Sequence, residues 1–310
     1  MKLLFLACLE PKTGNHTTAE RIRSHIESAG HTCELHHAEE FQSSSDLANL
    51  LSQNIQFDGA LAIHLFKAGR LLLDIQVPFG IVFGGTDVNE DVKVEKRRAV
   101  MENVLLKARF AVAFTEKMKQ EAMLYLHSQS SKTYVQPQGI ETDISEDFDW
   151  TEFLQSAEWH SENPQNVLVI IGPKIDPVLT DAVEAVVRRT AGVFLAQERR
   201  QPELHAAMKR CFALVNSSIS EGMSAAILEA MDLGLPVLAR NIPGNTAIVQ
   251  NEVTGLVYSS PQEFVHQSQR LLSDHQLRAR VIRNGKVYVV KHHSVKQERE
   301  TYQRLVNMLH

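Results

Sequence analysis

The chain has 310 residues, of which 44% are apolar, and this length and composition predict two domains, each with its own hydrophobic core. Its net charge of −5, without an obvious basic stripe, disfavours nucleic acid as a partner. No apolar run approaches the length of a membrane span, so we expect no membrane-spanning segment.

The three cysteines, Cys8, Cys33 and Cys211, lie far apart and show no paired spacing. This distribution argues against a disulfide framework and against a zinc site, and it predicts a reducing compartment, the cytoplasm. The alternative is secretion, with the apolar residues 1–8 acting as a short signal peptide. Because the apolar run is short and no small-residue cleavage site follows it, we interpret these residues as the first buried strand.

In the first half of the chain, short apolar runs alternate with segments of helical pattern. We predict strands at residues 3–8, 32–36, 58–64, 78–83 and 110–115, and helices at residues 17–29, 45–53, 93–107 and 117–126. Strands that alternate with helices predict a parallel, doubly wound α/β sheet. Ligands of such sheets bind beyond the carboxyl ends of the strands, so the loops there are candidates for the functional site.

A polar stretch without a clear period separates the two halves. Beyond it we predict strands at residues 166–171, 193–196, 212–216 and 236–239, and helices at residues 179–190, 202–210, 261–273, 274–291 and 295–309. The predicted organisation is an N-terminal domain at 1–148, a linker at 149–165, a C-terminal domain at 166–294 and a last helix at 295–310.

The most informative segment places two carboxylates, Glu221 and Glu229, eight residues apart around the start of a helix. Ser224 is the predicted N-cap, its hydroxyl accepting from a backbone N–H two or three residues on, and Gly234 follows the helical run 225–233 as a left-handed cap. A helix start presents free N–H groups and a positive dipole end to a phosphate, and carboxylates accept hydrogen bonds from sugar hydroxyls. The alternative is an amphipathic helix without a ligand.

The run from residue 217 to 258 resembles the donor-site signature of group 1 glycosyltransferases (family 4, GT-B fold), which reads S-x-x-E-G, six residues, E-A-x-x-x-G-x-P-V, a glycine-containing turn and E-x-x-x-G-x-L-V. The resemblance implies two doubly wound Rossmann-like domains facing a cleft. It further implies transfer of a sugar from a nucleotide-sugar donor to an unidentified acceptor, with retention, and without a metal or a cofactor. The last helix is then expected to cross back onto the first domain.

The resemblance assigns roles to the signature residues. Glu229 would bind the ribose hydroxyls of the donor, and Glu221 would bind the hydroxyls of its sugar and count as catalytic. Backbone N–H groups of Gly222, Met223 and Ser224 would hold phosphate.

Loops of the first half carry further candidates. His64 ends a predicted strand, and the resemblance implies that it reaches the donor sugar as a catalytic residue; a lone histidine at a strand end is otherwise a structural residue. Gly14 and Asn15 follow the first strand and resemble the family's small-residue loop at the donor phosphate.

Two more motifs resemble the family with single departures. The loop that contains Thr86 and Asp87 resembles H-G-T-D, with Gly84 in place of the histidine, and the resemblance places both residues on the acceptor side of the cleft. Gln138 stands where the family's P-N-G turn has asparagine.

The second half departs from the family in one large feature. The resemblance leads us to expect an opening strand that ends in Gly-Arg, followed by a lysine and a helix, whose cations clamp the donor diphosphate. No such unit precedes the strand at 167–172, which instead resembles the second unit of the domain. We therefore expect a missing strand–helix unit near residues 157–160, leaving strand edges unpaired and apolar surface uncovered.

The missing unit keeps alternatives open for the function. Loss of one charge-stabilising donor costs roughly 100- to 1,000-fold in rate, so this chain could be an impaired isoform or a binding or regulatory protein. A sugar-nucleotide epimerase of the same fold is a further alternative, which the signature disfavours. Four arginines could replace the lost cations if the domain rearranged: Arg188, Arg189, Arg199 and Arg200.

Overall fold

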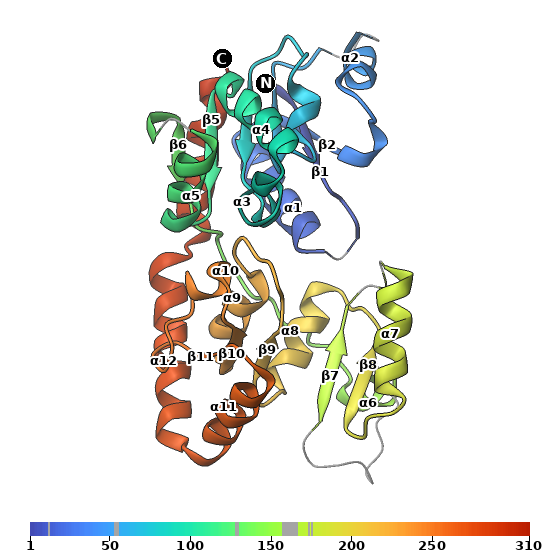
Figure 1. The fold of residues 1–310 in the computed structure, drawn as a ribbon, viewed down its shortest axis with the longest axis vertical. Coiled ribbons are helices and arrows are strands. Elements are labelled where there is room, and N and C mark those ends of the chain that lie inside the picture. The colour runs from blue at the N-terminus through green and yellow to red at the C-terminus, as the bar shows by residue number, and fades with distance from the viewer. Residues whose placement is uncertain (12, 53–55, 128–129, 157–166, 173, 175) are drawn as a thin grey trace.

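The computed structural model describes residues 1–11, 13–52, 56–127, 130–156, 167–172, 174 and 176–310. Residues 157–160, near which we expect the missing unit, lie outside the described residues, as do residues 161–165 of the predicted linker. The two chain ends lie together at the N-terminal part of the molecule (Figure 1).

The N-terminal part is built on one sheet of six parallel strands in the order β2-β1-β3-β4-β5-β6. The strands are β1 (Lys2–Ala7), β2 (Thr32–His37), β3 (Gly59–Ile63), β4 (Phe79–Val82), β5 (Phe110–Ala113) and β6 (Thr133–Val135). Every residue of β3, β4 and β5 is buried, which is why these strands read as continuous apolar runs. Residues 2–7 form an inner strand of this sheet, in agreement with the predicted first strand.

Helices connect these strands. The α-helices are α1 (Gly14–Glu27), α2 (Ser44–Ser52), α3 (Gly85–Asn89), α4 (Glu95–Lys107) and α5 (Glu116–Leu126). Short 3-10 helices are η1 (Ala38–Glu40), η2 (Gly69–Leu72), η3 (Asp91–Lys93) and η4 (Ser130–Lys132). Helix α3 was not predicted. It forms because the Asp87 carboxylate accepts the Gly84 N–H (2.8 Å) and so satisfies a donor at the start of the helix.

The C-terminal part contains two smaller parallel sheets, ordered β11-β10-β9 and β7-β8. The strands are β7 (Leu168–Ile171), β8 (Val193–Ala196), β9 (Leu214–Asn216), β10 (Val237–Arg240) and β11 (Leu256–Tyr258). The helices are α6 (Trp150–Ser156), α7 (Pro177–Val187), α8 (Gln201–Lys209), α9 (Ala225–Asp232), α10 (Pro243–Thr246), α11 (Pro261–Ser273), α12 (His275–His292), α13 (Val295–Val306) and the 3-10 helix η5 (Asn307–Leu309).

The split between β7 and β9 is what the loss of a central strand predicts. Within the described residues, β9 pairs only with β10 and β7 only with β8, so each has one unpaired edge. Val167 and Leu168, at the start of β7, are 39% and 42% exposed, and no residue of α7 is buried. The expectation of unpaired edges and uncovered apolar surface is therefore met in this half.

Helix α6 lies in the stretch that we predicted to be an irregular linker. Trp150 and Phe153 stack in this helix with ring centroids 5.3 Å apart, and Phe153 is buried. Phe153 belongs to a small core that includes Ala196 of β8 and Ala207 of α8. Aromatic packing against distant elements, rather than a local apolar period, therefore accounts for the helix.

The last helix, α13, leaves the C-terminal part and runs along the N-terminal part (the red helix in Figure 1). It packs there against α1. Glu298 of α13 is completely buried and pairs with two side chains of α1, Arg21 (2.9 Å) and His25 (3.0 Å). Tyr302, one turn further along α13, is also completely buried. The chain end therefore ties the two parts together through one buried carboxylate and its apolar surroundings.

Candidate functional site

The loop between β9 and α9 is organised by the side chain of Asn216, the last residue of β9. Its Nδ2 donates to Ser224 Oγ (3.1 Å) and to Glu221 Oε1 (3.5 Å), so it links the two ends of the loop. Its Oδ1 accepts from the Ser218 N–H (3.2 Å) and from Asn245 Nδ2 (2.9 Å). The shape of the loop therefore depends on the buried amide of Asn216 and not on Gly222 alone.

Ser224 occupies the predicted N-cap position of α9 but does not cap the helix through its hydroxyl. The prediction of a cap hydrogen bond is wrong because Ser224 Oγ instead accepts from Asn216. The first turn of α9 leaves backbone N–H groups without helical partners at the positive end of the helix, where an anion is stabilised. Gly234 has a φ of +77°, as predicted for the left-handed residue that ends the helix.

Glu229, in the middle of α9, is buried and held from α8. Its Oε1 accepts from Gln201 Nε2 (2.8 Å), and its Oε2 lies 3.6 Å from His205 Nε2. His205 Nδ1 lies 2.8 Å from the carbonyl oxygen of Asp143, so this nitrogen carries a proton. Although burial alone would lower the pKa of His205, the hydrogen bond and charge of Glu229 raise it above its ordinary value.

His64 stands directly after β3 in a left-handed backbone conformation (φ 73°), and its ring is buried. Its Nδ1 lies 3.1 Å from Thr86 Oγ1 and 3.8 Å from Asp87 Oδ2. Its Nε2 is buried and has no hydrogen-bond partner, which is uncommon for a buried nitrogen. Burial lowers the pKa of His64, so the ring is neutral near pH 7.

Asp87 is completely buried and serves the backbone around His64. Its carboxylate accepts from the N–H groups of Leu65 (3.0 Å), Phe66 (3.4 Å) and Gly84 (2.8 Å). Asp87 therefore fixes the turn that follows His64.

Gly84 is required by the position of His64. A Cβ atom at residue 84 would overlap the imidazole ring, so the residue that replaces the family's histidine leaves the space which His64 fills.

The two parts of the molecule meet through glycines. A Cβ atom at Gly85 of the N-terminal part would overlap the backbone nitrogen of Gly222 in the C-terminal part. Within the C-terminal part, a Cβ atom at Gly244 would overlap the backbone of Glu221. Asn89 Nδ2 also donates to the carbonyl oxygen of Glu221 (3.2 Å). His64 and Glu221 are thus brought to one interface from opposite parts of the chain.

Comparison with known proteins identifies the family of the chain. The profile of the family described as glycosyl transferases group 1 matches residues 151–288. The chain is 48% identical to glycosyltransferase 1 domain-containing protein 1 of Xenopus tropicalis, over 99% of this chain and 97% of that protein. The chain belongs to the group 1 glycosyltransferases. The alignment runs over 338 positions, whereas the chain has 310 residues, so the Xenopus protein carries residues without a counterpart here.

Solved structures show the same GT-B fold for this group 1 glycosyltransferase. Anabaena HepE in complex with UDP and glucose superposes with a TM-score of 0.74, at 16% identity over 99% of each chain. Sucrose-phosphate synthase of Thermosynechococcus elongatus has a TM-score of 0.78, at 13% identity over 99% of this chain and 98% of its own. No helix in the described ranges is long and apolar enough to cross a membrane.

Gly14 and Asn15 lie at the start of α1, where the Thr13 hydroxyl caps the helix by accepting from the His16 N–H (3.3 Å). A Cβ atom at Gly14 would meet nothing within 4 Å, so no close approach requires a glycine there. Within the described chain, neither predicted residue hydrogen-bonds to the Glu221 loop.

The four arginines that could have replaced the missing cations are engaged elsewhere. Arg188 pairs with Glu184, Arg189 donates to the Ala185 carbonyl, Arg199 donates to Ser156 and Arg200 pairs with Glu203. A cation that was not predicted, Arg240, donates to the Ser217 carbonyl oxygen (3.4 Å) at the start of the donor loop.

Sequence reasoning missed the residues that hold the two glutamates. Asn216 could have been found because it ends a buried strand at the carboxyl edge of the sheet. Gln201 and His205 are spaced i,i+4 on one face of α8, but the contact of that face with Glu229 is a tertiary feature without a local signal.

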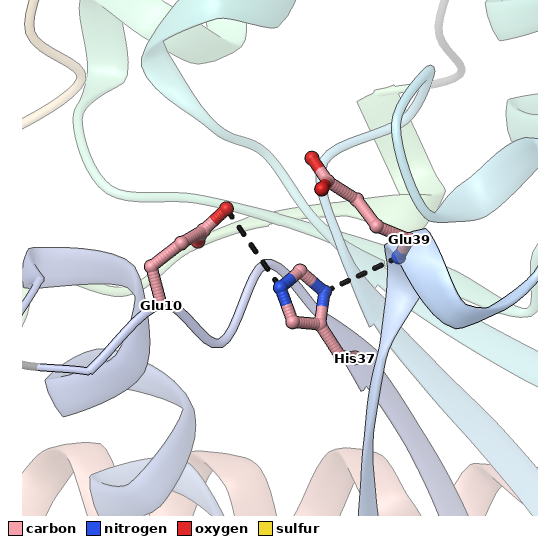
Figure 2. A group of neighbouring side chains, drawn as sticks. All are labelled: Glu10, His37 and Glu39. Carbon is pink, nitrogen blue, oxygen red and sulfur yellow. Dashed lines mark hydrogen bonds and ion pairs between the residues drawn. The ribbon is translucent and has the colours of Figure 1, made fainter. Parts of the chain in front are cut away.

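One group of side chains has the composition of a metal site, Glu10, His37 and Glu39 at the carboxyl ends of β1 and β2 (Figure 2). His37 Nε2 lies 3.8 Å from Glu10 Oε1, and His37 Nδ1 accepts from the Glu39 N–H (3.2 Å). A neutral imidazole with Nδ1 as acceptor carries its proton on Nε2, so neither nitrogen offers a free lone pair to a cation. We therefore assign no metal to this group.

Proposed function

We propose that this group 1 glycosyltransferase binds a nucleotide sugar between the Glu221 loop and His64 and transfers the sugar, with retention, to an acceptor. The observation that carries the proposal is the unpartnered, buried Nε2 of His64 at the interface that the Glu221 loop shares. A buried nitrogen without a partner is costly, and a hydroxyl of the donor sugar would satisfy it. HepE, similar in fold, has been solved in complex with UDP-glucose.

The roles of the carboxylates follow from their partners. Glu229 Oε1 accepts from Gln201 and Oε2 lies 3.6 Å from His205 Nε2, so the remaining lone pairs of the two oxygens would accept from the ribose hydroxyls. Glu221 is half-buried and held by the Ser218 hydroxyl (2.8 Å), in position to accept from hydroxyls of the sugar. In this proposal both carboxylates act as fixed acceptors that need no reorganisation when the donor binds.

Backbone N–H groups would stabilise the negative charge that develops on the departing diphosphate. The N–H groups of Gly222, Met223 and Ser224 and the dipole of α9 favour a negative group there, and Arg240 adds a nearby positive charge. We propose that no metal and no cofactor take part.

The acceptor would enter from the side of Thr86. Asp87 is proposed to act on the acceptor only indirectly, because its carboxylate is already bound by three backbone N–H groups. The proposed location, the cytoplasm, rests on the three free cysteines.

A second candidate function is binding of a nucleotide sugar without turnover, by an impaired isoform or regulatory protein. The split between β7 and β9 favours it, since the unit expected to carry the diphosphate clamp belongs at this split. Binding and turnover are therefore tested separately.

Thermal unfolding against UDP, GDP, ADP and their sugar conjugates tests binding. A ligand at about 100 times its dissociation constant adds roughly 2.7 kcal/mol, so one nucleotide is expected to raise the midpoint. Glu221→Ala should weaken sugar-nucleotide binding more than free nucleotide binding, whereas the exposed Glu146→Ala is the control and should change neither. Release of nucleoside diphosphate from the bound conjugate then separates a transferase from a binding protein. An absence of shifts with all nucleotides would rule out both functions.

A further inference from the structure

Helix α12 (His275–His292) differs in charge from the rest of the molecule. It contains five Lys and Arg residues and no Asp or Glu, in a chain whose net charge is −5. The helix runs along the outer edge of the C-terminal part (Figure 1). A basic helix at the edge of an acidic protein is a feature that neither the fold nor the donor site requires.

The residues of α12 divide into two faces. The buried face consists of Leu277, Val281, Gly285 and Val289, spaced by four residues, and α12 packs against α9. The opposite face, here called the α12 outer face, consists of Arg280, Arg283, Lys286, Val287, Val290 and Lys291, all exposed. The helix therefore presents cations and apolar side chains together on its solvent side.

Among the described residues, the cations of the α12 outer face are largely without charged partners, although the charge of Arg280 helps to lower the pKa of Glu252. Within the described residues, none of the four forms an ion pair with a carboxylate, and Arg280 donates only to the backbone carbonyl of Glu252 (3.2 Å). The Glu252 carboxylate is engaged by Arg270 (2.7 Å). The positive charge of this face is thus available to an external partner.

The apolar members of the face identify the kind of partner. Val287 and Val290 are 60% and 70% exposed, one turn apart, and lie between the flanking cations. Nucleic acid offers phosphates to the cations but little to the valines. A bilayer with anionic lipids offers both, because apolar side chains enter the headgroup boundary while Lys and Arg remain at the lipid phosphates.

We propose that the α12 outer face docks this protein on the surface of an anionic bilayer, with the helix lying parallel to the membrane plane. The face carries four exposed cations, at the lower end of the roughly four to eight that are typical of lipid-binding basic clusters. Because α12 packs against α9, docking would hold the donor-site helix in a fixed orientation to the membrane. The proposal is independent of the proposed transferase activity.

Flotation of the full chain with vesicles tests the proposal. We expect binding to phosphatidylcholine vesicles with about 30% phosphatidylserine, and little binding to pure phosphatidylcholine. Binding should fall between 0.1 M and 1 M salt, where the Debye length drops from about 10 Å to 3 Å. Equal binding to both kinds of vesicle, or none to either, would overturn the proposal.

Paired variants locate the surface. Each cation near an anionic bilayer contributes a factor of about five, so Arg283→Gln with Lys286→Gln should weaken binding roughly 25-fold. The matched control, Lys93→Gln with Lys96→Gln, removes two exposed cations next to and within α4 and should leave binding within about twofold. Val287→Ser with Val290→Ser should also weaken binding, although it keeps all charges.

All variants should keep the melting temperature of the wild type, since the altered side chains are exposed. Equal effects of the α12 and α4 variants would show general charge attraction and overturn the assignment to α12. Loss of binding in the charge variant with no effect of the valine variant would show attachment by charge alone, and it would overturn the entry of the valines into the headgroup boundary.

Discussion

Replacing Glu298 with alanine should be among the most damaging single changes to stability outside the donor site. Glu298 is completely buried, and its carboxylate accepts from Arg21 at 2.9 and 3.3 Å and lies 3.0 Å from His25 Nε2. The side chain of Arg21 is 17% exposed and that of His25 is 5% exposed. The substitution leaves a guanidinium that cannot lose its proton facing a cavity without a counter-charge.

The size of the effect follows from this burial. Removing one partner of a buried ion pair costs about 3–5 kcal/mol. If the whole chain of 310 residues unfolds as one unit, this corresponds to about 5–8 °C in the midpoint. The same helix supplies a control, since Glu300 is 61% exposed and lies 3.9 Å from Lys296. Glu300→Ala should cost less than about 0.5 kcal/mol.

The contribution of Glu298 to the free energy of unfolding depends on pH, and the sign of this dependence follows from its pKa. Burial alone would raise the pKa of Glu298, but hydrogen bonds from His25 and Arg21 and the charge of Arg21 hold it below its ordinary value of 4.5. The folded state then binds this proton less readily than the unfolded state, so the contribution is present above pH 4.5 and is lost as the pH falls below it. Glu298→Ala should therefore lose less stability than the wild type on acidification.

Urea unfolding of the wild type and both variants, at pH 7 and near pH 4, measures these differences. A cost for Glu298→Ala equal to that of Glu300→Ala would refute the reasoning. An unchanged pH dependence would show that the carboxylate is not the group that titrates.

Three further changes probe the site. Gly84→Ala should displace the His64 ring and abolish transfer, whereas Gly172→Ala, where a Cβ meets nothing within 4 Å, should keep the wild-type rate. Normal activity of the first variant would count against the position of His64. Tyr258→Phe removes a hydrogen bond to the Asn216 carbonyl (3.0 Å) and should cost about 1 kcal/mol in unfolding, and a neutral result would show that this bond does not support the loop. Because its pKa is raised, His205 should stabilise the fold at low pH and lose this contribution as the pH rises above 6.5. His205→Asn should therefore flatten that part of the pH–stability curve. An unaltered curve would exclude the pairing with Glu229.

The elements of the fold could be predicted where burial alone determines the pattern. The strands of the N-terminal sheet are apolar on both faces, so their runs are visible without knowledge of their neighbours. Helix α6 could not be predicted, because Phe153 is buried by β8 and α8, which are distant in sequence. The split of the second sheet followed from a missing unit in the motif order rather than from any local signal.

The sequence motif was sufficient to predict which residues belong to the site, but not all of their contacts. The position of Glu221 and the left-handed Gly234 are local features of the sequence. The hydroxyl of Ser224, in contrast, has two competing uses, and the choice of Asn216 over the helix start depends on how β9 enters the loop. The buried state of Asp87 likewise depends on the turn after β3, which supplies two of its three donors.

Isothermal titration of the wild type and Glu229→Ala with UDP, GDP and ADP tests the donor site most directly. We expect one nucleotide to bind the wild type at a single site and its 2′,3′-dideoxy analogue to bind more weakly. Hydrogen bonds to a charged group contribute about 1.5–3 kcal/mol, so Glu229→Ala should lose roughly 10- to 150-fold in affinity and the preference for ribose with it. Binding of no nucleotide, or equal affinity and equal ribose preference in both proteins, would contradict a donor site at Glu229.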